Sequence, residues 1–247
     1  MDLAAPPPTD SRSSTGLQAG IFDVDGVLLA SPHERAWREA LEGLADPARF
    51  TTAMYQAEVA GKPRLDGARA ALTALGVADA DRRAEAYAEA KQARLEELID
   101  AGAVSAFPDA LRLVAALAAE GFRMAVASSS KNANAMMRPI RLPSGASLLD
   151  AFAANLCGRD LKHGKPDPEI FLLAAGALNT PPEQCFVAED ATAGIEAAAA
   201  GRMTALGVAR LGDTQPLLAA GADLVVTSLD QVDAGALAHG RLTGRVT

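Results

Sequence analysis

Two aspartates one residue apart, Asp23 and Asp25, lie in the segment Gly-Ile-Phe-Asp-Val-Asp-Gly over residues 20–26. Side chains alternate along a strand, so both carboxylates project to one side of the chain where this apolar strand ends. Two carboxylates this close repel each other unless a cation or a shared proton lies between them. The pair therefore indicates Mg²⁺, a nucleophile and an acid or base in one short turn, although a strand that ends in an ordinary polar turn is the plainer alternative.

Three further polar segments follow later in the chain. Residues 128–132 read Ser-Ser-Ser-Lys-Asn, residues 163–168 read His-Gly-Lys-Pro-Asp-Pro, and residues 189–190 read Glu-Asp. Together they supply carboxylates for a metal, hydroxyls and helix N-terminal amides for a phosphate, and one cation, Lys165. Each segment alone has a plainer interpretation, because serines and acidic residues also begin helices. In combination they predict phosphoryl transfer, for which Mg²⁺ held by few carboxylates and the substrate phosphate is usual.

Short apolar segments alternate with helical patterns along most of the chain, which predicts a parallel α/β sheet. The expected strands are residues 20–24, 123–127, 184–188, 203–208 and 224–226, and the expected helices between them are 108–120, 168–176 and 193–200. Ligands of open α/β sheets bind beyond the carboxyl ends of the strands. Three of the four polar segments follow such ends, and the segment with Lys165 precedes the third strand, so one site is expected there.

Residues 33–103 interrupt this alternation with an almost purely helical pattern. We therefore expect a Rossmann-like, doubly wound parallel sheet core over residues 19–32 and 104–247. An inserted α-helical cap domain is expected over residues 33–103, and a flexible tail over residues 1–18.

Composition limits the partners of this chain of 247 residues. Its net charge of −8 argues against nucleic acid or an anionic membrane surface as a partner. No apolar stretch is long enough to span a membrane, and the first 17 residues lack the apolar core of a signal peptide. The two cysteines, Cys157 and Cys185, predict buried free thiols in a reducing compartment. We expect a cytoplasmic monomer.

The four polar segments occur in the order of the four motifs of the haloacid dehalogenase superfamily, which this chain resembles from residue 20 to about residue 226. The resemblance implies that Asp23 becomes an aspartyl-phosphate and that Asp25 is the general acid or base and lends its backbone carbonyl to the metal. It implies that Ser128, with the amide of Ser129, holds the phosphoryl group and that Lys165 bridges this group and the nucleophile. The implied Mg²⁺ site consists of Asp23, Asp25, Glu189 and Asp190.

The expected cap resembles that of the β-phosphoglucomutase-like branch of this superfamily. His33, four residues before Trp37, resembles a histidine that assists proton transfer. Arg64 resembles an arginine that grips the distal phosphate of a sugar bisphosphate, and Lys91 resembles a cap lysine that faces the substrate. The plainer alternatives are a cap core residue for Trp37 and a solvated helix residue for Lys91. The second motif of the branch implies further substrate contacts from Ser129, Ser130, Lys131 and Asn132.

Two segments depart from the pattern of that branch. The loop over residues 27–32 is shorter before the histidine, which leaves Ser31 as the substitute for a threonine of the branch. Residues 136–150 form a longer link than usual, for which the sequence indicates no purpose.

The resemblance implies Mg²⁺-dependent phosphoryl transfer on a small phosphorylated sugar. We favour a β-phosphoglucomutase-like interconversion of hexose 1-phosphate and 6-phosphate, because a well-placed sugar hydroxyl can outcompete water. A phosphatase that hydrolyses a small sugar phosphate is the first alternative. The second is a catalytically silent binding protein with the same fold, against which the joint retention of the aspartates and of Lys165 argues.

Overall fold

The computed structural model describes residues 16–245, so most of the predicted tail over residues 1–18 lies outside the described residues. A parallel six-stranded sheet forms the core, in the order β5-β4-β1-β6-β7-β8. The strands are β1 (Ala19–Phe22), β4 (Arg123–Val126), β5 (Ala154–Asn155), β6 (Cys185–Glu189), β7 (Thr204–Val208) and β8 (Leu224–Val226). Strand β1 lies between β4 and β6, where the strand order reverses, so the residues after it lie at the usual ligand-binding point of such sheets.

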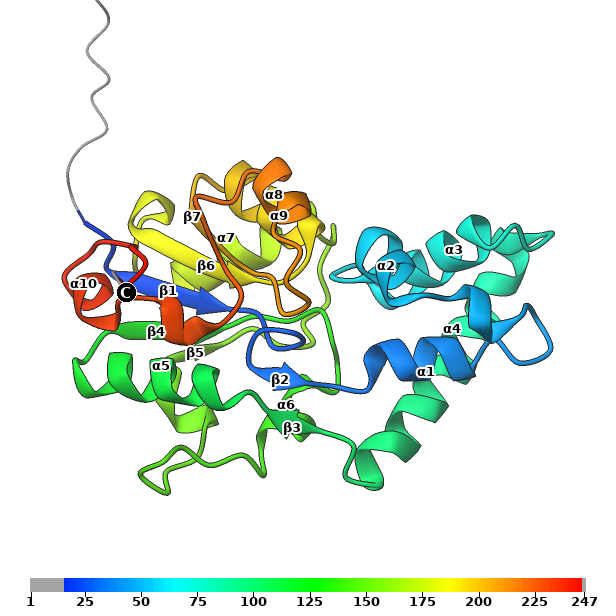
Figure 1. The fold of residues 1–247 in the computed structure, drawn as a ribbon, viewed down its shortest axis with the longest axis horizontal. Helices are drawn as coiled ribbons and strands as arrows, with labels where there is room; N and C mark the ends of the chain where they lie inside the picture. Colours follow the sequence, from blue (N-terminus) through cyan, green and yellow to red (C-terminus); the bar gives the residue numbers. More distant parts are fainter. Residues whose placement is uncertain (1–15, 246–247) are drawn as a thin grey trace, which may run out of the picture.

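Helices cover both faces of the sheet (Figure 1). Phe22 points to the face covered by α5 (Pro108–Ala119) and α10 (Ala234–Ala238). Its neighbour Ile21 points to the other face, as the alternation of strand side chains requires. That second face is covered by α7 (Glu169–Ala177), α8 (Thr192–Ala200) and α9 (Gln215–Ala219). The expected doubly wound α/β core is therefore confirmed.

Three strands and three short helices of the core were not predicted, and two of these helices are α9 and α10. Strand β5 and the antiparallel pair β2 (Leu29–Ala30) and β3 (Ser105–Ala106) are two residues long, too short to show a periodic pattern. Helix α6 (Ala133–Met137) begins the segment 136–150 that had no assigned purpose. Leu142 and Leu148 of this segment are buried in the core beside α5, so the segment covers one end of the hydrophobic core.

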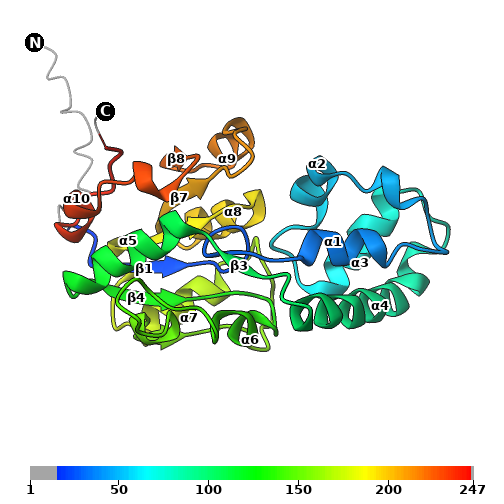
Figure 2. The ribbon, with the colours of Figure 1, turned by 60° about the horizontal axis from the view of Figure 1, so that its bottom comes forward.

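A helical cap lies to one side of the sheet (Figures 1 and 2). Trp37 packs against Tyr87 with ring centroids 5.2 Å apart, and the Tyr87 hydroxyl donates a 2.8 Å hydrogen bond to the Trp37 carbonyl. Trp37 is therefore a core residue of the cap, the plainer of its two interpretations. The cap elements are α1 (His33–Glu39), α2 (Thr52–Met54), a π-helical turn (Tyr55–Val59), α3 (Arg64–Ala74) and α4 (Ala80–Asp100).

Two further expectations concern the cysteines and membranes. Cys157 and Cys185 are both free thiols, and Cys185 is buried whereas Cys157 is half-buried. No helix in the described part of the chain combines the length and the apolar character that a membrane span requires.

Candidate functional site

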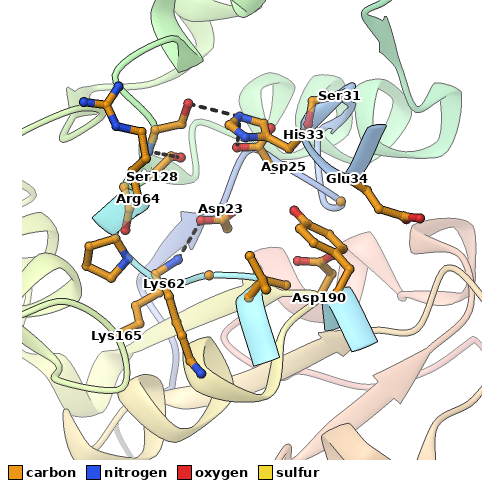
Figure 3. A pocket seen from close by; sticks show the side chains of 18 of the residues that line it. Asp23, Asp25, Ser31, His33, Glu34, Lys62, Arg64, Ser128, Lys165 and Asp190 are labelled. Atoms are coloured by element: carbon orange, nitrogen blue, oxygen red, sulfur yellow. Dashed lines mark hydrogen bonds and ion pairs between the residues drawn. The ribbon is translucent and has the colours of Figure 1, made fainter. Parts of the chain in front are cut away.

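A cavity of about 620 Å³ lies between the cap and the carboxyl ends of β1, β4 and β6. Residues of the cap and of the core both line it, and Figure 3 labels ten of the lining residues that it draws. Of the predicted site residues, the cavity lining includes Asp23, Asp25, His33, Arg64, Lys91, Ser128, Ser129, Ser130, Lys131, Asn132, Lys165 and Asp190. Ser31 also lines it, whereas Glu189 is buried behind it and only 1% exposed.

Lys165 joins two carboxylates at the floor of this cavity. Its ammonium lies 2.6 Å from Oδ1 of Asp23, directly after β1, and also pairs with Oε1 of Glu189, the last residue of β6. Burial alone lowers the pKa of Lys165, but these two carboxylates raise it above its usual value. Lys165 therefore stays protonated and holds Asp23 in place.

Asp23, Glu189 and Asp190 each place a carboxylate oxygen within 4.8 Å of the others, so this cluster could hold a metal ion. Burial, which outweighs the attraction of Lys165, raises the pKa of Asp23 to about 7, and burial together with the neighbouring carboxylates raises that of Asp190 well above its usual value. Both shifts mark a shortage of positive charge. Carboxylate oxygens are the ligands that Mg²⁺ prefers, so the donor set fits the predicted ion.

The Asp25 side chain lies apart from this cluster. Its Oδ2 is 3.6 Å from Nε2 of His33, and its buried Oδ1 has no hydrogen-bond partner among residues 16–245. The backbone after Asp25 does approach the cluster, because a Cβ added at Gly26 would lie 1.9 Å from Oδ2 of Asp190. Only glycine fits there, also because its φ is +78°. The geometry thus suits a metal contact by the backbone of this turn rather than by the Asp25 carboxylate.

Glu189 already uses both of its oxygens. Oε1 pairs with Lys165, and Oε2 accepts hydrogen bonds from the amides of Asp190 and Ala191 at 2.9 and 3.1 Å. A Cβ at Gly194 of α8 would lie 2.0 Å from the Glu189 carboxylate, so the first turn of that helix packs directly on it. Glu189 thereby orients Lys165 and the Asp190 backbone.

The serine segment forms the wall that follows β4. Ser128 is 2% exposed, and its hydroxyl accepts a 3.0 Å hydrogen bond from the Ser130 amide. The Ser130 hydroxyl in turn accepts one from the Asn132 amide at 3.3 Å. These bonds are typical of a capped turn before a helix, so the plainer interpretation of the serines is present as well. The buried hydroxyl of Ser129 has no partner among the described residues.

His33 connects the cap to the core. Lys91 of α4 lies 2.8 Å from Nδ1 of His33, and Nε2 lies 3.2 Å from the Ser130 hydroxyl, on the same side as Asp25. Burial lowers the pKa of His33 to about 4 and that of Lys91 to about 7. His33 is therefore neutral near pH 7. When Lys91 donates a hydrogen bond to Nδ1, the proton of the neutral ring lies on Nε2, which faces the core.

Lys91 is not a solvated helix residue, because only 3% of its surface is exposed. Arg64, the first residue of α3, is exposed along the cavity and has no hydrogen-bond or ion-pair partner among the described residues. Lys131 lines the cavity and pairs with Asp160 at 3.0 Å. The upper part of the cavity therefore offers a free guanidinium to an anionic group.

Tyr55 also lines the cavity and was not predicted. It begins the π-helical turn, a feature that is frequent at functional sites. Burial and the carboxylates of Asp25, Asp190, Glu34 and Asp23 raise the pKa of its hydroxyl, which therefore remains a hydrogen-bond donor. In the sequence Tyr55 resembles an ordinary aromatic core residue of a helix, and no motif or residue spacing around it indicates a functional role.

This fold and site define a class: α/β enzymes that hold an aspartate, a lysine and an acidic cluster at the end of the central strand, next to an inserted group of helices. A sequence model of the haloacid dehalogenase-like hydrolase family matches residues 17–202, and the chain belongs to this family. It is thus an enzyme of the phosphotransferase and phosphatase kind, as its relatives are.

Among the relatives, β-phosphoglucomutase of Bacillus subtilis is 34% identical over 215 residues, which cover 85% of this chain and 89% of the relative. A phosphorylated carbohydrates phosphatase of Thermotoga maritima is 31% identical, over 85% of this chain and 94% of the relative. The crystal structure of β-phosphoglucomutase from Clostridium difficile is similar with a TM-score of 0.72 and 27% identity, over 91% of this chain and 96% of that one. The resemblance inferred from the four motifs is confirmed.

Proposed function

We propose that this protein catalyses Mg²⁺-dependent phosphoryl transfer on a small phosphorylated sugar, with interconversion of hexose 1-phosphate and 6-phosphate as the favoured reaction. The observation that carries the proposal is the Lys165 ammonium, 2.6 Å from Asp23 and buried beside Glu189. It keeps one carboxylate oriented toward the cavity and offers positive charge to an incoming phosphate.

In this mechanism a carboxylate oxygen of Asp23 attacks phosphorus, and the bond between phosphorus and the sugar oxygen breaks. Asp25 gives its proton to the departing sugar oxygen, so the products are an aspartyl-phosphate and a free hydroxyl. Lys165 and the Ser128 segment hold the phosphoryl oxygens as their charge is redistributed. Bound Mg²⁺ supplies further neutralisation of the phosphate charge.

In the second half of the reaction Asp25 takes the proton of an acceptor hydroxyl, whose oxygen attacks the phosphorus on Asp23; the bond between phosphorus and the Asp23 oxygen breaks and the free carboxylate is restored. The contact of His33 with both Lys91 and the Ser130 hydroxyl supports a sugar hydroxyl as acceptor, because it joins the cap to the core beside Asp25. The free guanidinium of Arg64 supports a second phosphate on the same molecule, which it would hold in bidentate fashion.

Hydrolysis of a small sugar phosphate is the second candidate. It differs only in the acceptor, which is then water. Relatives that carry a phosphatase name favour it, including hexitol phosphatase A of Escherichia coli, 30% identical over 86% of this chain and 91% of the relative.

A product assay separates the two. The purified protein is incubated with β-glucose 1-phosphate, Mg²⁺ and a trace of glucose 1,6-bisphosphate, and glucose 6-phosphate and inorganic phosphate are followed together. Glucose 6-phosphate that appears before free phosphate supports the mutase, and free phosphate first supports the phosphatase. The absence of both products, with other hexose phosphates as well, contradicts the proposal.

A further inference from the structure

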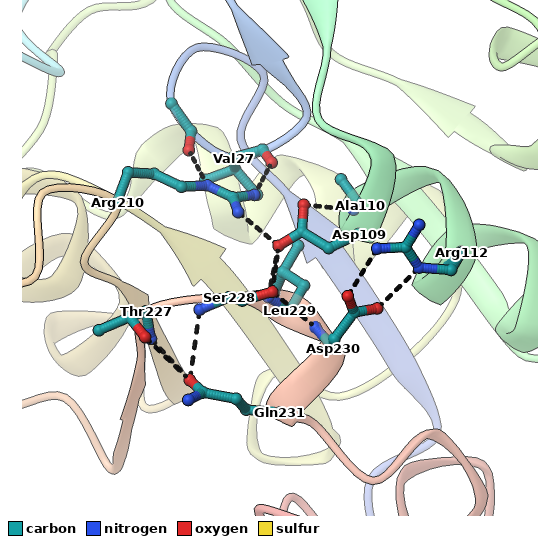
Figure 4. A network of polar contacts seen from close by, with 11 residues as sticks. Val27, Asp109, Ala110, Arg112, Arg210, Thr227, Ser228, Leu229, Asp230 and Gln231 are labelled. Carbon is teal, nitrogen blue, oxygen red and sulfur yellow. Dashed lines mark hydrogen bonds and ion pairs between the residues drawn. The ribbon is translucent and has the colours of Figure 1, made fainter.

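Arg210 lies beyond β7 and reaches the turn that carries Asp25, although 184 residues separate it from Gly26 (Figure 4). Its Nε donates a 3.1 Å hydrogen bond to the Gly26 carbonyl, and one Nη donates a 2.8 Å bond to the Val27 carbonyl. These carbonyls belong to the two residues that directly follow Asp25. One side chain, which also lines the cavity, thus holds the backbone of the turn.

The guanidinium is itself held from three sides. Its other Nη pairs with Oδ2 of Asp109 at the start of α5, and its plane lies 3.9 Å from the ring centroid of Phe107. Asp109 is only 6% exposed, and the same Oδ2 accepts from the Ser228 hydroxyl at 2.8 Å and the Leu229 amide at 2.7 Å. Arg210 is therefore a fixed support, since its donors are engaged and its anchor is buried.

The turn needs such a support. Oδ1 of Asp25 has no hydrogen-bond partner among residues 16–245 and Oδ2 lies 3.6 Å from Nε2 of His33, so the direction of this carboxylate depends mainly on the backbone beneath it. The same backbone leads directly into β2 and then into the cap. The chain returns from the cap through β3, and the amide of Phe107, directly after β3, donates a 3.0 Å hydrogen bond to the Leu28 carbonyl. Without a support for the turn, a displacement of the cap would also displace the backbone of Asp25.

We propose that Arg210 is a positioning residue for Asp25, whose carboxylate it keeps aimed at the sugar oxygen by holding the Gly26 and Val27 carbonyls. The inference rests on the proposed function, in which Asp25 transfers a proton to that oxygen. Proton transfer of this kind contributes roughly 10²–10⁴-fold to a rate and depends on hydrogen-bond geometry. It matters for a sugar alkoxide, a poor leaving group, and far less for p-nitrophenolate, which leaves as a stable anion.

The test compares two substrates in Arg210→Gln, which keeps a polar chain but loses the fork of donors. The kcat/KM for a hexose phosphate, which reports the steps up to formation of the aspartyl-phosphate and departure of the sugar oxygen, should fall by roughly 10–100-fold, a share of the acid–base contribution. The loss on p-nitrophenyl phosphate should be smaller by a factor of at least about 10. A merely structural role would lower both rates by the same factor, because it would remove folded enzyme.

Two further variants complete the experiment. Arg112→Gln is the matched control, since Arg112 lies on the same helix as Asp109 and binds exposed Asp230 at 2.6 and 2.8 Å without touching the turn; both rates should stay unchanged. Asp109→Asn replaces the carboxylate that anchors Arg210 by a neutral amide. It therefore weakens the anchor of Arg210 while the Arg210 side chain itself remains present. It should show the same bias between substrates, in weaker form.

Equal losses on both substrates in Arg210→Gln and Asp109→Asn, or no loss in either, would overturn the inference while the wild-type activity stands. If Arg210→Gln does not fold, as seen from its melting curve, Asp109→Asn decides alone by the same criterion. A wild-type protein inactive on both substrates overturns the proposed function, and the role of Arg210 falls with it.

Discussion

Four carboxylates and one permanent cation share the space after the central strand, and this imbalance governs the chemistry of Asp23. Asp25, Glu189 and Asp190 accompany it, and in the described part of the chain Lys165 is the Lys or Arg that forms ion pairs in this group, with Asp23 and Glu189. Neutral His33 adds no charge at pH 7. An anionic substrate can enter such a site only with a further cation, which agrees with the predicted need for Mg²⁺.

Replacement of Asp23 by Asn should abolish turnover while the protein remains folded. The change keeps the size of the side chain, replaces the nucleophilic carboxylate by a neutral amide, and leaves Glu189 as the ion-pair partner of Lys165. Asp25→Asn should lose roughly 10²–10⁴-fold through the missing proton transfer. Steady-state kinetics on a hexose phosphate measure both, with circular dichroism as the folding check and exposed Asp213→Asn as the matched control. Full activity in Asp23→Asn would exclude an aspartyl-phosphate.

Lys91 makes the stability of the protein depend on pH. Its pKa is about 7 in the folded protein and 10.5 when unfolded, so between these values the unfolded state binds more protons and stability rises with pH. Lys91→Met should therefore be more stable than wild type near pH 6. This advantage should shrink as pH rises above 7, by at most about 1.4 kcal/mol per pH unit. Urea denaturation between pH 6 and 9.5 measures it, and a pH-independent difference would contradict burial of the charge.

At the scale of elements, the first turn of α3 is the part of the cap that would hold a second phosphate in the proposed reaction. Arg64 begins this helix at the cavity, and the helix continues onto the solvent face, where Arg69 pairs with Asp66 and Asp81. One helix thus offers one arginine that lines the cavity and one that lies on the solvent face.

Arg64→Ala should sharply reduce phosphoryl transfer to a sugar and leave hydrolysis of a small aryl phosphate much less affected, since that substrate has no second phosphate. A lost bidentate contact to phosphate is strong enough for a change of roughly 10-fold or more. Arg69→Ala is the matched control, because its exposed ion pairs contribute little. Parallel assays on both substrates decide the matter, and equal losses would make Arg64 a structural residue.

At the scale of the molecule, the cap and the core meet over a cavity whose floor is acidic and whose roof carries Lys91 and Arg64. His33 of the cap lies 3.2 Å from the Ser130 hydroxyl of the core, and Asp23 below them is only 6% exposed. The substrate therefore joins two parts of the protein that have separate hydrophobic cores.

EDTA should silence the enzyme and Mg²⁺ should restore it, whereas Ca²⁺ should substitute poorly because it prefers more ligands and looser geometry. Mg²⁺ should also raise the melting temperature of metal-free protein, since it binds the folded state. This rise should be smaller in Asp190→Asn. Differential scanning fluorimetry measures the shift without turnover, and activity that survives exhaustive chelation would count against the metal site.

Part of this site could be predicted from the sequence because its residues follow strands directly. Asp23, Ser128 and Asp190 lie within two residues of the ends of β1, β4 and β6, and parallel strands bring such positions together. The helical insertion was equally visible, since a helical pattern over tens of residues is a strong signal. Strands of two residues, such as β2 and β3, carry no such signal and were missed.

The amino-acid sequence by itself determined the α/β class, the helical insertion and the four polar segments, because periodicity and strand-end chemistry are local properties. Only the tertiary structure decided that Lys91 is buried against His33, that Tyr55 faces the acidic cluster and that Arg210 supports the turn after Asp25. These contacts join residues 58 and 184 positions apart in the pairs Lys91–His33 and Arg210–Gly26. Packing of whole elements sets such distances, and no local pattern records them.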